Sequence, residues 1–248
     1  MNKRIQYHIL NVLPKYDWKN YYIVRHGAFA TNGEIKTIFS FFALLLCYDN
    51  IEYFYLFLTS SFIWSCIEGV LQIMNIRKIN KMFFFDHQIP LFFSLLLQGT
   101  QEAGFVCVYG LWFADRLFTH WRLFLLSNIA IFLLVLKNGY NCKIQKHASI
   151  RCITTQNSLL CLTGTGIINI YGLFYIETYR PLLMCLCMSI LGSVWTFGQV
   201  IMGLRCVETD KGLASNEERF AILSFDVFIE IACAYLPFYF IVHLFLNS

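Results

Sequence analysis

Four acidic residues lie inside long apolar stretches of the sequence: Glu68, Glu102, Asp226 and Glu230. On membrane-insertion scales an ionisable side chain in a bilayer costs at least about 2.5–3.5 kcal/mol, so several of them in one chain require an explanation. Acids in such a place are protonated, share a proton, bind a cation or contact water. The chemistry that follows is proton or cation relay, polar ligand binding, or acid catalysis.

The acids belong to polar stripes with helical spacing. The three stripes are Ser61, Ser65, Glu68 and Gln72; Ser94, Gln98, Gln101 and Glu102; and Asp226, Glu230, Cys233 and Pro237. We expect all three stripes to point into a helical bundle and to form one substrate-binding or ion-binding site. The residues predicted for this site are Glu68, Gln72, Gln98, Gln101, Glu102, Asp226 and Glu230.

The composition indicates which elements position these stripes. Of the 248 residues, 58% are hydrophobic and 14% are charged, whereas a soluble domain has about 45–50% apolar and about 25% charged residues. The excess apolar surface must face lipid. The formal charge of +4 comes from Lys and Arg scattered between apolar runs, which excludes a nucleic-acid partner of the usual kind.

A spanning helix needs about 20 mostly apolar residues. We predict an all-α, polytopic integral membrane bundle of about seven spans: 35–48, 51–74, 89–112, 117–136, 158–176, 181–204 and 220–246. Residues 35–248 form a single membrane domain. Residues 1–34 form a cytoplasmic segment, in which a short interfacial helix and a frayed tail are alternatives.

The distribution of basic residues predicts the orientation. Of the 19 Lys and Arg residues, only Arg116, Arg122 and Arg180 fall on one side of the seven predicted spans. Because short cytoplasmic loops are enriched in Lys and Arg, the N-terminus is predicted to be cytoplasmic and the C-terminus to lie on the opposite side. Lys36, at the start of the first span, counts with the cytoplasmic side.

This orientation also sets the depth of the acids. Glu68 and Asp226 are predicted in the cytoplasmic third of the membrane, with Glu102 and Glu230 nearer its middle. The prediction is two layers of carboxylates with no Lys or Arg at matching depth.

An internal repeat is a further hypothesis. The alignment that matches Glu102 with Glu230 superposes the second span on the sixth and the third on the seventh without gaps, and it matches Gln98 with Asp226. The arrangement would be a parallel 3+1+3 repeat, a type that transporters use.

Three functions remain open. The leading hypothesis is binding or transport of a small solute or cation, coupled to protonation of Glu102 and Glu230. The second is a membrane-embedded enzyme in which a buried acid protonates an isoprenoid or lipid substrate, as an isomerase or cyclase would. Aromatic residues could then shield a cationic intermediate: Trp64, Phe105, Tyr109, Trp195 and Tyr235. The third is a non-catalytic assembly or receptor subunit.

Neither a cofactor nor a metal site is predicted. The run Thr163-Gly164-Thr165-Gly166 lacks the third glycine of a dinucleotide fingerprint. Cys142, His147 and Cys152 lack both the spacing and the fourth ligand of a zinc site. The lipid bilayer is the expected partner, and the sequence does not distinguish the plasma membrane from an endomembrane.

Overall fold

The computed structural model describes residues 21–26, 32–74, 77–78, 82–141, 149–176, 178–202, 205–209 and 212–247. The interfacial helix or frayed tail expected near the N-terminus lies outside the described residues. Cys142 and His147 also lie outside them, and the side chain of Cys152 is not described.

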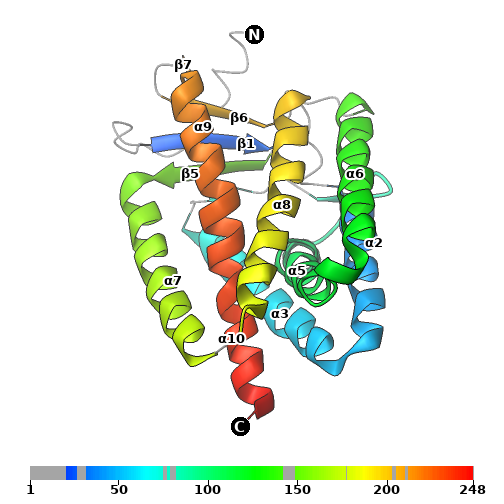
Figure 1. The fold of residues 1–248 in the computed structure, drawn as a ribbon. Helices are drawn as coiled ribbons and strands as arrows, with labels where there is room; N and C mark the ends of the chain where they lie inside the picture. The colour runs from blue at the N-terminus through cyan, green and yellow to red at the C-terminus, as the bar shows by residue number, and fades with distance from the viewer. Residues whose placement is uncertain are drawn as a thin grey trace.

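Helices make up most of the described chain (Figure 1). They are α2 (Gly33–Leu46), the short η3 (Cys47–Asp49), α3 (Ile51–Ile73), α4 (Leu91–Gly99), η4 (Thr100–Gly104), α5 (Phe105–Ala114), α6 (Leu117–Asn141), α7 (Thr155–Tyr175), α8 (Arg180–Ile201), α9 (Asn216–Ser224), η5 (Phe225–Cys233) and α10 (Ala234–Asn247). The segments η4 and η5 are π-helical turns, so α4–η4–α5 and α9–η5–α10 are each one continuous rod.

Four stretches of helix in the described chain are long and apolar enough to cross a membrane: Ile51–Ile73, Leu91–Ala114, Leu117–Lys137 and Arg180–Ile201. Large apolar side chains on the outside of the bundle are exposed, among them Phe62 at 67% and Phe174 at 83%. An apolar exterior of this extent fits contact with lipid rather than water.

Short polar side chains set where the helices begin. The side chain of Asn32 accepts a hydrogen bond from the Ile35 amide at 2.9 Å and so caps α2. Asn50 caps α3 in the same way through the Glu52 amide, also at 2.9 Å. Each cap satisfies an amide that has no partner inside its helix. The Asn50 cap lies at the tight corner between α2 and α3.

A small sheet, which the all-α prediction missed, lies at one end of the bundle (Figure 1). It has five strands in the order β2-β5-β1-β6-β7. The strands are β1 (Tyr21–His26), β2 (Arg77–Lys78), β5 (Ser149–Thr154), β6 (Cys206–Thr209) and β7 (Gly212–Leu213), and a separate hairpin joins β3 (Phe83–Phe84) to β4 (His87–Gln88). The strands of this sheet come from the segment before α2 and from three connections between helices. Because they pair across long stretches of sequence, the pairing leaves no local pattern in the sequence.

Several elements start or end 128 residues apart in the chain. The strands β1 and β5 are each six residues long and start 128 residues apart, and the helices α3 and α8 end at the same offset. The π-turn η4 falls within η5 when shifted in this way.

Residues at this offset also meet in space. Arg180 Nη1 donates to Glu52 Oε1 at 2.8 Å, across 128 residues. Cys107 Sγ contacts the Tyr235 carbonyl oxygen at 3.9 Å, across the same separation. Contacts between counterparts are expected near a two-fold axis that relates two halves.

The end of the bundle away from the sheet holds a network of charged side chains. Arg180 contacts both carboxylate oxygens of Asp115, at 2.6 and 2.7 Å, and forms a 2.7 Å ion pair with Glu52. Tyr53 donates to Asp115 at 2.6 Å and accepts from Arg116 at 2.9 Å. The network, which we call the far-end network, ties the start of α8 to the corner after α2 and to the turn after α5.

Replacement of Arg180 by Gln should destabilise the protein, because it leaves Asp115 and Glu52 close together without their shared cation. We expect a loss of about 1–3 kcal/mol, with roughly 2–4 °C of Tm per kcal/mol. Thermal unfolding in detergent measures the change. Arg122→Gln is the control, because Arg122 is exposed on α6 and stacks on Trp121 alone among the described rings. Equal Tm values for both variants would contradict this account.

Candidate functional site

Two of the three predicted polar stripes meet in the structure. Glu68 and Gln72 lie on α3, Gln98 lies on α4, and Gln101 and Glu102 lie on η4. The helix α3 packs against both α4 and η4. These five residues therefore surround one contact between two helical rods.

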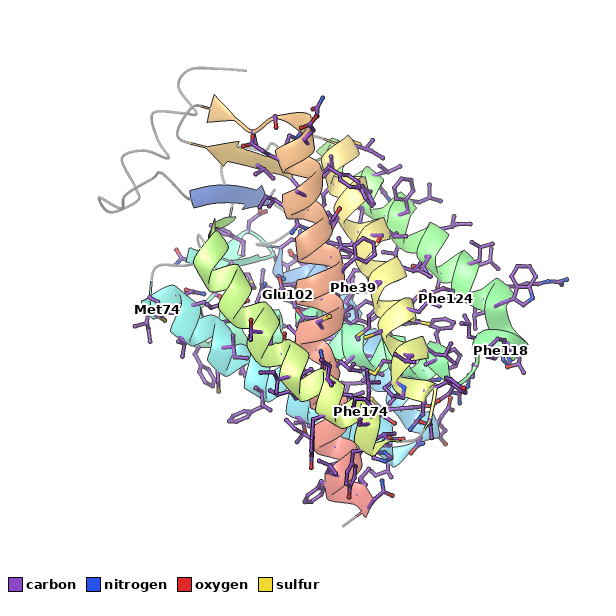
Figure 2. The ribbon with its side chains drawn as sticks, turned by 60° about the vertical axis from the view of Figure 1, so that its left-hand side comes forward. Phe39, Met74, Glu102, Phe118, Phe124 and Phe174 are labelled. Atoms are coloured by element: carbon purple, nitrogen blue, oxygen red, sulfur yellow. The ribbon has the colours of Figure 1, made fainter. Side chains whose placement is uncertain are left out.

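Glu102 is held by neighbours from both rods. Trp64 Nε1 donates to Glu102 Oε2 at 3.2 Å, and Gln98 Nε2 donates to Glu102 Oε1. In Figure 2, Glu102 and Phe39 lie towards the middle of the bundle, whereas Met74 and Phe118 lie at its edges. Hydrogen bonds to both carboxylate oxygens fix the direction in which this acid points.

Glu68 is the most deeply buried predicted acid among the described side chains, with 0% of its surface exposed. Gln98 is equally buried, and Gln101 is 6% exposed. A carboxyl group in this position exchanges bulk water for protein groups, so its charge state depends on its immediate neighbours.

Lys36 is a site residue that the sequence analysis missed. It was counted among the basic residues on the cytoplasmic side, and no base was expected at the depth of the acids. That expectation was wrong, because Lys36 is only 3% exposed and its Nζ donates to Gln101 Oε1 at 2.8 Å. One turn later, Ser40 Oγ donates to Thr100 Oγ1 at 2.7 Å. The i, i+4 spacing of Lys36 and Ser40 was the available signal, since it marks a fourth polar stripe.

The π-turn η4 is held by contacts on two sides. Lys36 and Ser40 of α2 bond to its first two residues on one side. On the other side Gly99 and Gly104 bring the rod against Ser61 and Ser65 of α3. A π-turn shifts the helical register, and such turns often occur at functional sites. Here the turn presents Gln101 to α2 and Glu102 to α3.

Aromatic rings line the same region. Trp64 meets Tyr235 edge to face at 4.8 Å between ring centroids. Phe39 lies 4.9 Å from Phe105 and 5.4 Å from Trp195. All five rings belong to the hydrophobic core or pack against it. The acids therefore lie beside a wall of aromatic surface that both halves of the chain supply.

Several buried polar atoms near the acids make no hydrogen bond within the described residues. They are Ser61 Oγ, Gln72 Nε2 and Gln98 Oε1. Buried polar groups are rarely left unsatisfied, because each one costs about 1–3 kcal/mol. A polar ligand that contacts α3 and α4 would remove this cost. The described residues contain no group of three or more His, Cys, Asp or Glu placed to hold a metal ion.

The third stripe is described only in part. The backbone of Asp226 and Glu230 belongs to η5, which packs against α8 and α7, but their side chains lie outside the described residues. Pro237 lacks the amide that would bond to the Cys233 carbonyl. Asn169 of α7 donates to that carbonyl oxygen at 2.8 Å instead. This bond fixes α7 beside the distorted rod that carries Asp226 and Glu230.

Comparison with known proteins gives no match: no protein-family model, no curated protein and no solved structure matches this chain.

The close contact at Gly99 should be intolerant of any side chain. A Cβ at this position would overlap Ser65 Oγ and the Ser61 carbonyl oxygen, so Gly99→Ala must separate the rods or displace Glu102. We expect a loss of about 2 kcal/mol or more, measured as Tm. Gly164→Ala is the matched control, since a Cβ there meets nothing within 4 Å. That helical Gly→Ala change should be neutral or stabilising; the reverse order of effects would refute the packing argument.

Proposed function

We propose that this chain crosses the membrane seven times, with the N-terminus in the cytoplasm and the C-terminus on the other side. The described helices group into seven rods when α4–η4–α5 and α9–η5–α10 are each counted once. The segment before α2 and three connections between helices are all predicted to be cytoplasmic, and all four contribute strands to a single sheet at one end. The C-terminus lies at the opposite end (Figure 1). Both observations support an odd number of crossings.

We also propose that the rods form two parallel repeats of three, joined by α6. The repeated offset of 128 residues supports this, as do the contacts between Glu52 and Arg180 and between Cys107 and Tyr235. In the sheet, Ile23 pairs with Cys152 and Val24 with Arg151. At the 128-residue offset, Ile23 corresponds to Arg151 and Val24 to Cys152. A two-fold axis through the centre of the β1–β5 ladder would therefore exchange these two pairs.

Epitope tags at the two termini test the crossing number. In sealed, inside-out vesicles from expressing cells, an N-terminal tag should be removed by added protease and a C-terminal tag should be protected. A tag placed at residue 144, in a connection between two predicted spans, should behave like the N-terminal tag. Equal sensitivity of the N- and C-terminal tags would indicate an even number of spans and overturn the orientation.

We propose that the site on α2, α3 and η4 binds a small solute in a proton-linked manner, as the central step of transport. The observation that carries this proposal is that Lys36 and Glu68 are buried and Glu102 is partly buried, on three adjoining elements. One base and two acids leave one negative charge without a counter-charge. In a medium of low dielectric this favours the uptake of one proton or of one positive charge on a ligand. Unsatisfied atoms on Ser61, Gln72 and Gln98 would serve a polar ligand.

The position of these groups supports entry from the sheet end. Lys36 lies in the first turn of α2, and Glu68 lies near the end of α3 that leads to β2. Towards the other end, Phe105–Ala114 is an almost wholly apolar, buried helix, and the far-end network closes the bundle beyond it. A ligand from the cytoplasm would reach Glu68 before Glu102.

Substitution of the acids tests the proposed function. In proteoliposomes, Glu102→Gln and Glu68→Gln should each reduce solute-dependent proton uptake by about 10-fold or more, because neither amide can take up a proton. Glu217→Gln, at an exposed position in the first turn of α9, should leave uptake unchanged. Unaltered uptake and stability in both the Glu102 and the Glu68 variant would end the proposal.

A second candidate function is acid catalysis on an isoprenoid or lipid substrate. The specific observation in its favour is the aromatic wall beside Glu102, because ring faces stabilise a carbocation that forms when an acid protonates an alkene. Membranes supplied with isoprenoid or acyl compounds would then yield an isomer or cyclised product of unchanged mass, and Glu102→Gln would abolish it. If the same substitutions affect only thermal stability or complex formation, the protein is an assembly or receptor subunit.

A further inference from the structure

Gln98 is fully buried and holds Glu102 through one end of its side-chain amide. Gln98 Nε2 donates a hydrogen bond to Glu102 Oε1, whereas Gln98 Oε1 makes no hydrogen bond within the described residues. Trp64 Nε1 donates to the other oxygen of the same carboxyl group at 3.2 Å. Both carboxyl oxygens accept from N–H donors, an arrangement that fits an ionised carboxylate. In this state Gln98 presents an unused acceptor beside a negative charge.

The orientation of this amide depends on the proton of Glu102. A protonated Glu102 donates its O–H to the carbonyl end of Gln98, which requires the terminal amide to turn by about 180°. The turn exchanges Oε1 and Nε2 almost in place, because the two ends of an amide have nearly the same shape. An N–H donor then stands where the unused acceptor was. A ligand that donates a hydrogen bond to Gln98 therefore meets a matching group only when Glu102 is ionised.

Other charges act on Glu102 from the elements around η4. In the described chain these elements are chiefly α2, α3, α4 and α5, of which α4 has no titratable side chain. Apart from the far-end network, the buried titratable side chains on the other three are Lys36, Glu68, Cys107 and Tyr109. They contribute to the pH at which Glu102 takes up a proton. Gln98 bonds to Glu102 directly, so its amide responds to that proton whatever the charge on the other groups.

We propose that the ligand is an organic ammonium ion and that the Gln98 amide makes this ligand and the proton on Glu102 exclude each other, so that the site exchanges one for the other. This inference rests on the proposed ligand-binding function and names its ligand class. An ammonium N–H satisfies Gln98 Oε1, and its charge is attracted to the neighbouring carboxylate. The buried rings of Trp64 and Tyr235, whose centroids are 4.8 Å apart, supply aromatic surface of the kind that binds organic cations.

Infrared titration of the protein without ligand is the first test. The carbonyl band of a protonated carboxyl group that is absent from Glu102→Gln belongs to Glu102, and its intensity is followed against pH. Gln98→Met removes one donor to the carboxylate, so the midpoint of this titration should rise by about 1 pH unit or more. Gln199→Met, which replaces a buried glutamine on α8, should leave the midpoint unchanged.

An unchanged midpoint in Gln98→Met would overturn the inference, because Gln98 would then not sense the charge of Glu102. If Gln98→Met does not accumulate, Gln98→Glu takes its place. Two neighbouring acids then share a proton, and the band must persist to higher pH than in the unmodified protein. Loss of the band at the unmodified pH would again refute the role of Gln98.

Binding of probe amines is the second test. Purified protein in detergent is mixed with methylammonium, benzylammonium or benzyltrimethylammonium chloride, of which the last has no N–H donor. At least one of the two primary amines should raise Tm by about 2 °C or more near pH 8 and far less near pH 5, and its binding should release a proton into weakly buffered solution. No rise with either primary amine, an equal rise with benzyltrimethylammonium, or binding without proton release would each overturn the proposal.

The outcomes keep this inference apart from the proposed transport, because both tests use protein in detergent and require no membrane crossing. If both succeed but proton uptake by proteoliposomes is unaltered in Glu102→Gln, the chain binds amines by exchange with a proton, and only the proposed function fails. If proton uptake depends on Glu102 but Gln98→Met titrates like the unmodified protein, the proposed function stands and this inference is wrong.

Discussion

A polar group inside a bilayer has no water to turn to, so the protein itself must satisfy it. This constraint accounts for most of the contacts in the candidate site. Trp64 donates to Glu102, Lys36 donates to Gln101, and Ser40 donates to Thr100. The same constraint explains why Asn169 of one helix bonds to the carbonyl that Pro237 leaves open in another. Each of these bonds joins different helices, so satisfying the polar groups also determines how the helices are arranged.

Much of the helical framework could be predicted, because hydropathy reports burial in lipid directly. The predicted span 51–74 corresponds to α3 at Ile51–Ile73, and the predicted span 181–204 begins one residue inside α8. The stripes on α3 and η4 were predicted from spacing, which a helix converts into a shared face. Lys36 was misplaced because a basic residue at the edge of a span can point to headgroups or inwards. Packing of Gly33 against Phe83 decides this, and that contact is not local in the sequence.

Under the proposed repeat, the two halves would differ in which helix carries the small residue at a close contact. In the first half the small residue is Gly99 on the third rod, and it receives Ser61 and Ser65 of α3. In the second half the small residue is Gly192 on α8, and it receives Ile231 and Val227 of the corresponding rod. Thr196, buried and bonded to Arg205, stands at the position that corresponds to Glu68. The close contacts at Gly99 and Gly192 therefore place the small residue on different rods of the proposed repeat.

The strand order of the sheet has a consequence for biogenesis. β1 lies in the middle of the sheet, although it is the first of the described strands to be synthesised. Its two partners, β5 and β6, leave the ribosome only after four and six of the helical rods have been made. During that interval β1 has two open edges, which are the kind of surface that pairs with foreign strands. Late pairing of this kind leaves both edges of β1 open to pairing with other strands while the rest of the chain is made.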